Sequence, residues 1–355
     1  MSEPGTAPSS TSGPQAAPDL PTTMRAVATT QPLPVADERS LVDVELPVPE
    51  PGPRDLLVRV RAVSVNPVDT KVRRSADPGG EPRVLGYDAA GVVVAVGAEV
   101  ERFAVGDAVW YAGALDRQGS DAELQVVDER LVGRAPRSLD DAEAAALPLT
   151  ALTAWEVLLE RARLTAGSGG VLLVVGAAGG VGSMVVQMAR LLTRMTVVAT
   201  ASREESRAWV RDLGAHAVVD RTGDVAAAVR EVAPDGVDVV VTAYSEGNVE
   251  LFAEVLRPFG QVVAIDDPEG LDLLPLKSKS ISWHWELMFT RSLHRTADRH
   301  RQGEVLDEVA RMVDEGHLRT TLSERTGPIS AAVLRAAHAR VESGSVVGKV
   351  VVEGW

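Results

Sequence analysis

The hydrophobic positions of this chain follow two different periods. Up to about residue 133, short apolar runs are separated by Pro and Gly, which is the pattern of short strands joined by turns. Three of these strands are predicted at 56–63, 89–96 and 108–111. Strands that are interrupted by turns at intervals of about 8 to 12 residues favour a small barrel or sandwich.

After residue 140, helical and strand periods alternate. Two helices, at 140–147 and 150–163, come first, and Pro148 separates them. Strands are then predicted at 171–175, 195–200, 217–220, 237–243 and 261–265, with amphipathic helices at 181–192, 203–213, 224–232 and 249–256. This alternation predicts a doubly wound parallel sheet with right-handed crossovers, so the chain is expected to be α/β with a separate small barrel or sandwich before the sheet.

The end of the chain leaves this alternation. Residues 280–289 contain two tryptophans, and amphipathic helices at 301–315 and 330–342 and a strand at 346–352 follow. We expect this last part to fold back onto the first domain.

The strand at 171–175 runs directly into a turn of small residues, GAAGGVG at 176–182. Strand, glycine turn and helix in this order are the context of a dinucleotide fingerprint, because small residues let the backbone approach a pyrophosphate at a helix N-terminus. Ala177 replaces the first glycine of the G-x-G-x-x-G pattern, whereas Gly179 and Gly182 are kept. The alternative is an ordinary tight turn, but the context favours a Rossmann nucleotide-binding domain.

Composition restricts the class of protein further. The chain has 355 residues, of which 45% are hydrophobic, enough for about two domains. A net charge of −14 argues against nucleic acid or an anionic membrane as a partner. The absence of cysteine excludes disulfides, thiolate metal ligands and a cysteine nucleophile.

No targeting segment is expected. We find no apolar run that approaches the ~20 residues of a membrane span, and no signal peptide, so we expect a soluble, cytoplasmic protein. Residues 1–23 are rich in Pro, Ser, Thr, Gly and Ala and are expected to form a disordered tail.

Several motifs agree on one family. They are SVNPVD at 64–69, VLGYDAAGVV at 84–93, FAVGDAV at 103–109, AAALPLTALTA at 144–154, AAGGVG at 177–182 and GSVVGKVV at 344–351. With these motifs the chain resembles the medium-chain dehydrogenase/reductase superfamily, in its zinc-free quinone oxidoreductase-like branch, over essentially everything after Met24. The run from Lys279 to Arg291 is similar to a subgroup often labelled zinc-type alcohol dehydrogenase-like.

The resemblance implies a domain division. A GroES-like β-barrel catalytic domain would comprise residues 24–147 and 290–355, and a Rossmann NADPH-binding domain would comprise residues 148–289.

The resemblance also bears on metal binding. Zinc members of the superfamily hold a catalytic zinc with a Cys, a His and a second Cys or an acid. Here the matching positions are Asn66, Tyr87 and Leu149, and the six histidines are scattered with no H-x-x-x-H pair. Because a tetrahedral zinc site needs nitrogen, sulfur or carboxylate ligands, we expect no metal site of the family's type.

The nucleotide is predicted from the end of the second strand of the Rossmann pattern. NAD enzymes place an acid there, about 20 residues past the glycines, to bind the ribose 2′-hydroxyl. Here the position is Ala201, and the following Ser202 and Arg203 suit the 2′-phosphate of NADPH, because a guanidinium can bind phosphate bidentately. The alternative is a helix cap and a solvated Arg. Glu204 and Glu205 would oppose a phosphate, but they also suit the first turn of a helix.

We expect NADPH to contact the glycine turn, the ends of the strands and the residues that the resemblance places on the cofactor side. These residues are Thr150, Ala177, Ala178, Gly179, Gly180, Val181, Gly182, Ser202, Arg203, Ala243, Ile265 and Lys349. The alternative for Lys349 is a solvated strand lysine.

The resemblance places Asn66 and the residues just after it beside the substrate. Asn66 would donate a hydrogen bond to a carbonyl oxygen or would only make a turn contact. Asp69 and Thr70 would position the nicotinamide or the substrate. Lys71 and Tyr87 are weaker candidates for a proton donor, and Tyr87 is as readily a packed core phenol.

Trp283, Trp285 and Phe289 are candidates for the wall of an aromatic substrate pocket. A dimer interface is the alternative for them, because related enzymes pair their sheets through this edge strand. We expect a homodimer.

The reaction is inferred from the missing metal ligands. Without a metal Lewis acid, a simple ketone or alcohol would lack the group that stabilises alkoxide charge. Hydride transfer to a quinone or an α,β-unsaturated carbonyl needs less stabilisation of charge, because the charge spreads onto a conjugated oxygen that hydrogen-bond donors can stabilise. The sequence therefore predicts an NADPH-dependent oxidoreductase of such substrates. The alternatives are an alcohol or aldehyde dehydrogenase and a non-catalytic NADPH-binding sensor.

Overall fold

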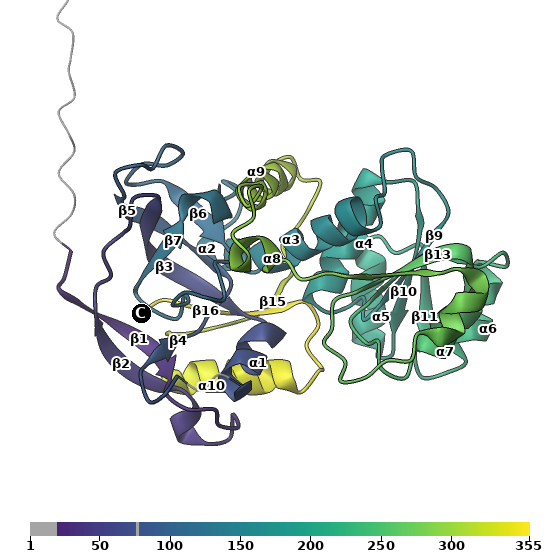
Figure 1. The fold of residues 1–355 in the computed structure, drawn as a ribbon, viewed down its shortest axis with the longest axis horizontal. Helices are drawn as coiled ribbons and strands as arrows, with labels where there is room; N and C mark the ends of the chain where they lie inside the picture. The colour runs from purple at the N-terminus through teal and green to yellow at the C-terminus, as the bar shows by residue number, and fades with distance from the viewer. Residues whose placement is uncertain (1–19, 76–77) are drawn as a thin grey trace, which may run out of the picture.

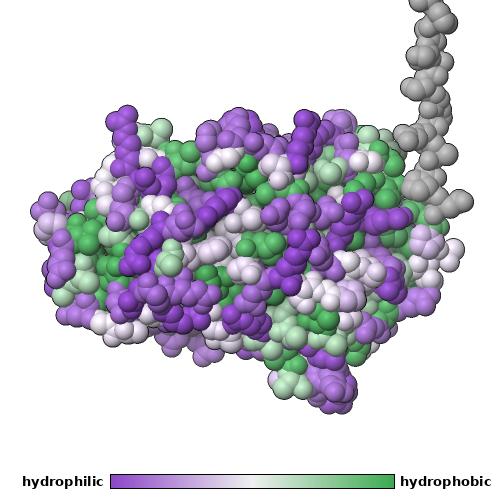
Figure 2. Space-filling view, turned by 180° about the vertical axis from the view of Figure 1, so that it is seen from behind, coloured by the Kyte–Doolittle hydropathy of each residue, from purple (hydrophilic) through white to green (hydrophobic). Residues whose placement is uncertain are grey.

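The computed structural model describes residues 20–75 and 78–355, which form two lobes side by side (Figure 1). The expected tail at 1–23 lies outside the described residues as far as residue 19. Of its remainder, Leu20 packs against the core of the first lobe, and Thr23 already begins the first strand. On the face seen in Figure 2, hydrophilic and hydrophobic residues are interspersed.

The first lobe is built on mainly antiparallel strands. From this part of the chain they are β1 (Thr23–Thr29), β2 (Val42–Pro47), β3 (Asp55–Val65), β4 (Arg83–Val84), β5 (Ala89–Val96), β6 (Ala108–Tyr111), β7 (Leu124–Asp128) and β8 (Val132–Arg134). A small sheet has the order β2-β1-β4, and in a larger sheet β3, β5, β6 and β8 are successive neighbours, with β7 also paired to β3. The three predicted strands are β3, β5 and β6. Three short 3₁₀ segments, Glu38–Ser40, Glu129–Leu131 and Leu274–Lys279, complete the connections of the two lobes.

The second lobe carries a six-stranded sheet in which all neighbours are parallel. Its strands are β9 (Val171–Val175), β10 (Thr196–Ala201), β11 (Ala217–Asp220), β12 (Val237–Thr242), β13 (Leu256–Ala264) and β14 (Ser282–Trp285). Its helices are α4 (Gly180–Leu192), α5 (Glu204–Asp212), α6 (Val225–Val232) and α7 (Val249–Val255). The order β11-β10-β9-β12-β13-β14 is that of a Rossmann sheet, which confirms the predicted α/β fold. Ligands of such sheets bind where the order reverses, here beyond the carboxyl ends of β9 and β12.

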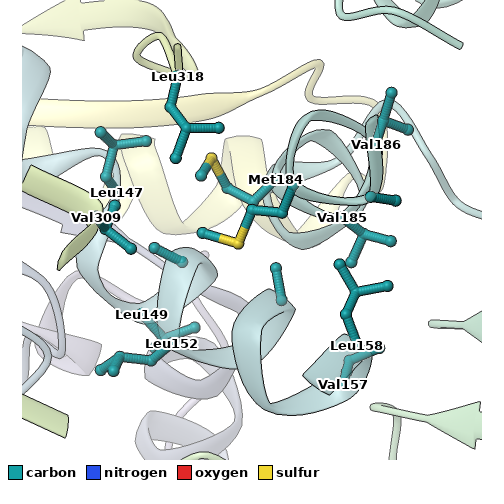
Figure 3. Packing of buried hydrophobic residues seen from close by; sticks show 14 of the residues in the cluster. Leu147, Leu149, Leu152, Val157, Leu158, Met184, Val185, Val186, Val309 and Leu318 are labelled. Atoms are coloured by element: carbon teal, nitrogen blue, oxygen red, sulfur yellow. The ribbon is translucent and has the colours of Figure 1, made fainter. Parts of the chain in front are cut away.

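A helical stretch joins the lobes. It comprises α2 (Asp141–Ala145), α3 (Pro148–Trp155) and a π-helical segment, Glu156–Arg161. Figure 3 shows Leu147, Leu149 and Leu152 of this stretch in one buried cluster with Met184 of α4 and with Val309. Residues 141–161 are long and apolar enough to cross a membrane, which the sequence analysis did not anticipate, but 83% of their apolar window is buried inside the protein. This stretch is therefore a core element that holds the two lobes together.

The end of the chain returns to the first lobe, as predicted. It forms α8 (Thr290–Leu293), α9 (Arg301–Asp314), β15 (Leu322–Thr326), α10 (Ala331–Glu342) and β16 (Lys349–Glu353). Strand β16 pairs antiparallel with β3 and parallel with β15, which extends the larger sheet to seven strands. Helix α1 (Pro67–Ser75), which follows β3 directly, packs against α10 through hydrogen bonds from Arg73 to His338 and Glu342.

The change of sheet falls between Arg134 and Val171 and again between Trp285 and Leu322. The predicted domain boundaries, at 147/148 and 289/290, lie inside these two intervals. Local ends differ slightly from the predictions. Helix α5 has Arg203 rather than Ser202 as its N-cap residue, and the Ser206 hydroxyl accepts the N–H of Arg203 at 3.1 Å.

Candidate active site

A continuous cleft lies between the lobes, beyond the ends of β9 and β12. One part, called the cofactor groove below, is lined by Gly176 and residues 179–182, by the ends of the parallel strands and by part of the segment 344–350. The other part, called the substrate cavity below, has a volume of about 380 Å³ and is lined mainly by apolar residues such as Leu149, Met288 and Phe289. The two parts share Asn66, Pro67, Leu149, Val181, Ala243, Tyr244 and Ile265.

The glycine turn of the cofactor groove has room for a ligand at one glycine and no spare room at the others. A Cβ on Gly182 would lie 2.4 Å from the carbonyl oxygen of Gly176, and a Cβ on Gly180 would lie 2.7 Å from Cδ of Lys349. At Gly179 the nearest atom would be 3.6 Å away. Gly179 is the N-cap residue of the 13-residue helix α4, and its own N–H donates to the carbonyl of Gly176 at 3.2 Å, so the N-terminus of the helix begins with the residues that follow it. This geometry fits the pyrophosphate of a dinucleotide.

A buried polar cluster lies where the groove and the cavity meet. The Lys349 ammonium donates to Oδ1 of Asn66 at 2.5 Å and to the carbonyl of Val65 at 3.1 Å, and lies 3.2 Å from Oδ2 of Asp88. Nδ2 of Asn66 donates to Asp88 at 2.9 Å and to the carbonyl of Ser64 at 3.2 Å. Asn66, Asp88 and Lys349, called the polar cluster below, therefore satisfy one another inside the protein.

The polar cluster is held in place from both lobes. Asp88 also accepts the backbone N–H of Leu149, at the start of α3, at 2.8 Å. Burial raises the pKa of Asp88 and lowers the pKa of Lys349, and their mutual attraction opposes both shifts. Because each charge offsets the burial cost of the other, the loss of either would leave an uncompensated buried charge.

The side chain of Asp69, a second buried carboxyl group, holds the backbone of the turn that carries Asn66. It accepts the backbone N–H of Asn66 at 2.6 Å and that of Gly86 at 3.1 Å. Burial raises the pKa of Asp69 to about 7, because its effect is larger than that of the two hydrogen bonds, which lower the pKa. Asp69 thus shapes the turn that carries Asn66.

Comparisons with known proteins agree with this geometry. Residues 213–352 match the family model of zinc-binding dehydrogenases, and residues 52–137 match that of the alcohol dehydrogenase GroES-like domain. A zinc-type alcohol dehydrogenase-like protein of Staphylococcus aureus is 37% identical over 313 residues, which is 86% of this chain and 92% of the relative. The chain belongs to the medium-chain dehydrogenase/reductase superfamily.

Other members of the superfamily include reductases of conjugated carbonyls and quinones. The NADPH-dependent alkenal/one oxidoreductase of Arabidopsis thaliana is 32% identical over 318 residues, 86% of this chain and 73% of the relative. A solved structure from Rhizobium etli with a provisional assignment as a zinc-dependent alcohol dehydrogenase is 50% identical, with a TM-score of 0.91 over 94% of this chain and 98% of the other. The quinone oxidoreductase of Coxiella burnetii is 26% identical, with a TM-score of 0.78 over 94% of this chain and 100% of the other. The chain is therefore an oxidoreductase of this superfamily, with a nicotinamide-binding Rossmann lobe and a GroES-like lobe.

Eight of the twelve predicted cofactor residues line the groove of this superfamily member. They are Thr150, Gly179, Gly180, Val181, Gly182, Ala243, Ile265 and Lys349. Ala177 is fully buried under the turn, and the carbonyl of Ala178 accepts the N–H of Gly348 at 2.8 Å. Ser202 and Arg203 lie outside the groove lining, at the end of β10.

Of the predicted catalytic residues, Asn66 and Lys71 line the substrate cavity. The structure does not support the predicted hydrogen bond from Asn66 to a substrate, because both of its amide hydrogens already have acceptors in the polar cluster. Asp69 and Thr70 do not line the cavity: Asp69 braces the turn, and the Thr70 hydroxyl donates to the carbonyl of Pro67 at 2.9 Å. Lys71 donates to Asp267 across the cleft at 2.7 Å.

Only some of the aromatic residues predicted for the site line the substrate cavity. Phe289 lines the substrate cavity, and Tyr87 lies behind it, with ring centroids 5.6 Å apart in an edge-to-face arrangement. Tyr87 is thus a packed core phenol, the alternative that the sequence left open. Trp283 and Trp285 do not line the cavity, because they lie on β14, the last strand of the parallel sheet, where they contact each other.

Two residues of the site were not picked out by the sequence analysis. Asp88, at the centre of the polar cluster, lies inside a motif used only for the resemblance. Tyr244 lines both parts of the cleft, and a Cβ on Gly176 would lie 2.8 Å from its ring. Tyr244 could have been identified from the sequence by its position two residues past β12, because ligands bind at the carboxyl edge of such a sheet.

Proposed function

We propose that this oxidoreductase uses NADPH to reduce a quinone or an α,β-unsaturated carbonyl without a metal ion. The observation that carries the proposal is the polar cluster, because an ammonium group, and not a set of metal ligands, meets Asn66 where the cofactor groove joins the substrate cavity.

The chemistry of the side chains at the family's zinc positions supports the metal-free part of the proposal. A divalent cation at Asn66 would be repelled by the Lys349 ammonium, which lies 2.5 Å from Oδ1 of Asn66. Leu149 has no side-chain ligand atom, and Tyr87 faces Phe289. In the described ranges 20–75 and 78–355, no three His, Cys, Asp or Glu side chains converge on a point where they could hold a metal ion.

The substrate cavity suits a conjugated, largely apolar acceptor. Bound NADPH supplies the hydride, and the protein contributes orientation and stabilisation of charge. The apolar side chains of Leu149, Met288 and Phe289 in the cavity lining would keep water away from a nicotinamide bound beside them.

We assign Lys71 as the donor to the negative charge that develops on the substrate oxygen. Its ammonium lines the cavity and has three N–H groups, of which the hydrogen bond to Asp267 uses one. The hydroxyl of Thr153, which also lines the cavity, is engaged with the carbonyl of Leu149 at 2.8 Å. Lys71 is therefore the better placed of the two.

The choice of NADPH rests on the end of β10. The acid that would bind a ribose 2′-hydroxyl is absent at Ala201, and Arg203 follows it. The Arabidopsis relative is itself named as NADPH-dependent.

The test is a substrate and cofactor survey of the purified protein. NADPH and NADH are supplied with quinones, enones, aldehydes and alcohols, with and without a chelator, and the metal content is measured. We expect NADPH oxidation with quinones or enones that the chelator leaves unchanged. Chelator-sensitive alcohol oxidation with stoichiometric zinc would instead identify an alcohol dehydrogenase, and NADPH binding without turnover would identify a sensor.

We also propose that the protein is a homodimer paired through β14. Strand β14 is the edge of the parallel sheet, and it carries the exposed side chain of Trp285. A second copy would cover this side chain and pair the open strand edge. Sedimentation of the wild type should give a dimer, and Trp285→Glu should give a monomer. A wild-type monomer at micromolar concentration would disprove the pairing.

A further inference from the structure

Glu286, which directly follows β14, brings a buried carboxyl group to the lining of the substrate cavity. Its Oε2 accepts the N–H of Nε of Arg161 at 2.6 Å. The other oxygen, Oε1, is also buried, and no N–H or hydroxyl group of a described residue donates to it. Because an unsatisfied carboxyl oxygen is costly inside a protein, the groups beside Glu286 decide its state.

A second buried carboxyl group, that of Glu156, lies against Glu286. Nη1 of Arg291 binds Oε1 of Glu156 at 2.6 Å. Burial raises the pKa of Glu156 well above its usual range, and the charge of Glu286 and a hydrogen bond between the two carboxyl groups act in the same direction. Because two carboxylates in contact resist double ionisation, Glu156 and Glu286 hold one proton between them. These two residues are called the acid pair below.

The charges around the acid pair favour retention of this proton. Arg161 faces the pair from the π-helical segment and Arg291 from α8, and Arg291 also binds Glu160 at 2.6 Å and Asp298 at 3.2 Å. His284 on β14 adds no cation, because burial and then the charge of Arg161 lower its pKa. The two guanidinium charges therefore already face three negative charges when the acid pair is protonated once. Loss of the proton would add a fourth negative charge without a new partner.

The backbone is irregular where it supplies the acid pair. Helix α3 brings Leu149 and Thr153 to the substrate cavity, and the chain then continues as the π-helical segment Glu156–Arg161. Residues five apart do not share a face of an α-helix, whereas the wider π-helical turn brings them together. Glu156 and Arg161, which are five apart, can thus both contact Glu286. Such turns occur frequently at functional sites.

We propose that Glu286 donates a proton to the carbon next to the carbonyl group of an α,β-unsaturated substrate, with Glu156 and Arg161 as positioning residues. This inference rests on the proposed function and narrows it to one of the two substrate classes. Protonation of a carbon atom needs a positioned acid, whereas the oxygens of a reduced quinone exchange protons directly with water.

The step balances with the hydride that bound NADPH supplies. The β-carbon of the substrate receives the hydride, and the electrons of the C=C bond move to give an enolate, whose oxygen accepts a hydrogen bond from Lys71. The α-carbon then takes the proton of the acid pair through Glu286. A new C–H bond forms, and the O–H bond breaks with its electron pair left on the carboxylate. One proton from water restores the acid pair.

The test compares two acceptors, an enone with a methyl group on its α-carbon and a quinone, with NADPH as the donor. The variants are Glu286→Gln, Glu286→Asp and Glu156→Gln, and Glu129→Gln is the matched control. Glu129 is also a buried glutamate that pairs with an arginine, Arg54, at 2.9 Å, but it lies outside both parts of the cleft. The readouts are kcat, KM and the ratio of enantiomers of the reduced enone.

In wild type one enantiomer should dominate, because the proton arrives from one face of the enolate. Glu286→Gln should lower kcat for the enone by about 100-fold and give both enantiomers, since water then supplies the proton. Its kcat for the quinone should stay within about threefold of wild type. Glu156→Gln should lower kcat for the enone by about tenfold at unchanged KM, and the control should match wild type.

Glu286→Asp keeps an acid at the same position and separates the loss of the acid from a disturbed fold. It should keep the dominant enantiomer even where kcat falls, and an equal mixture of enantiomers from this variant would count against the proposal.

The inference and the proposed function fail in different ways. If Glu286→Gln slows both acceptors equally and keeps one enantiomer, the acid pair only supports the cavity wall and the inference is wrong. Wild type that reduces quinones but no enone would also overturn the inference, while the proposed function would stand. Wild type that reduces neither acceptor would overturn both.

Discussion

The two walls of the cleft are built in different ways. The glycine turn of the cofactor groove is formed by backbone and small residues of one contiguous stretch, Gly176 to Gly182, in which the critical property is the absence of a side chain. The polar cluster beside the substrate cavity is formed by charged and amide side chains of the residue after β3, the residue before β5 and the first residue of β16. Its bond from Lys349 to the carbonyl of Val65 spans 284 positions of the chain. The groove therefore depends on local sterics, and the polar cluster depends on long-range electrostatics.

This difference predicts different modes of failure. A methyl group added to a glycine should disturb the groove, whereas replacement of a charged side chain by a neutral one of similar size should disturb the polar cluster. Variants of each wall can therefore test the steric and the electrostatic requirement separately.

The largest effect is expected for Lys349→Met. The change leaves Asp88 buried without its cation and removes the hydrogen bonds to Asn66 and Val65, so unfolding should become easier by about 3–5 kcal/mol. Turnover of a quinone or enone should fall by more than about 100-fold, since the turn that carries Asn66 loses its support. Denaturant titration and steady-state kinetics measure these two changes.

A second variant shows whether charge is the cause. Lys349→Met/Asp88→Asn removes both buried charges and should recover part of the lost stability, because the remaining pair is neutral. Lys277→Met, an exposed lysine of the second lobe, is the matched control and should behave like wild type. A double variant no more stable than Lys349→Met would show that packing of the lysine stem, and not charge, stabilises the cluster.

The next effect is the pH dependence of stability that Asp69 causes. Burial raises its pKa from 3.8 to about 7, so the folded protein keeps this proton over an interval in which the unfolded chain has lost it. The contribution of Asp69 to stability should therefore decline as the pH rises from about 4 to about 7 and level off above that range. Asp69→Asn cannot titrate, so its unfolding free energy should fall less steeply than that of wild type, by an amount of the order of 2–4 kcal/mol over the interval.

Only the difference between the two pH profiles counts in this experiment. The amide loses one acceptor for the N–H groups of Asn66 and Gly86, which lowers stability at every pH and leaves the slope unaffected. Denaturation at intervals from about pH 5 to pH 8, with the exposed Asp235→Asn as control, isolates the slope. Parallel profiles for Asp69→Asn and wild type would contradict the raised pKa.

The groove should respond to single methyl groups in two distinct ways. Gly182→Ala would bring Cβ within 2.4 Å of the Gly176 carbonyl, so we expect a loss of stability of about 1–3 kcal/mol together with weaker cofactor binding. Gly179→Ala has room for its methyl group and should keep stability within about 0.5 kcal/mol, yet it should weaken cofactor binding roughly tenfold by occupying the place of the phosphate. Thermal unfolding and cofactor titration of both variants test this. Tight cofactor binding by Gly179→Ala would show that the pyrophosphate does not pass this residue.

The same contrast explains what the sequence could predict. The strand 171–175, its glycine turn and the following helix are contiguous, so their pattern predicted the glycine turn of the groove. The polar cluster is created when β16 pairs with β3, which local patterns do not encode. The sequence therefore offered Asn66 as a free donor and missed Asp88 as its partner. The sequence analysis assigned Trp283 and Trp285 to the substrate pocket because they are aromatic, but whether a strand residue lies at the cleft depends on the order of the strands in the sheet.

The smallest effect is expected for the ion pair between Lys71 and Asp267, which both line the substrate cavity. Lys71 and Asp267 meet at 2.7 Å across the substrate cavity, with 43% and 75% of their side chains exposed. Exposed pairs contribute about 0–1 kcal/mol, so Asp267→Asn should change the unfolding free energy by less than about 0.5 kcal/mol. Because Asp267 competes with the substrate oxygen for the Lys71 ammonium, its removal should raise kcat/KM by about twofold, whereas Lys71→Gln should lower it by about tenfold at unchanged stability. If Asp267→Asn instead destabilised the protein by more than about 1 kcal/mol, the pair would be a structural tie between the lobes, and Lys71 would not be free to serve the substrate.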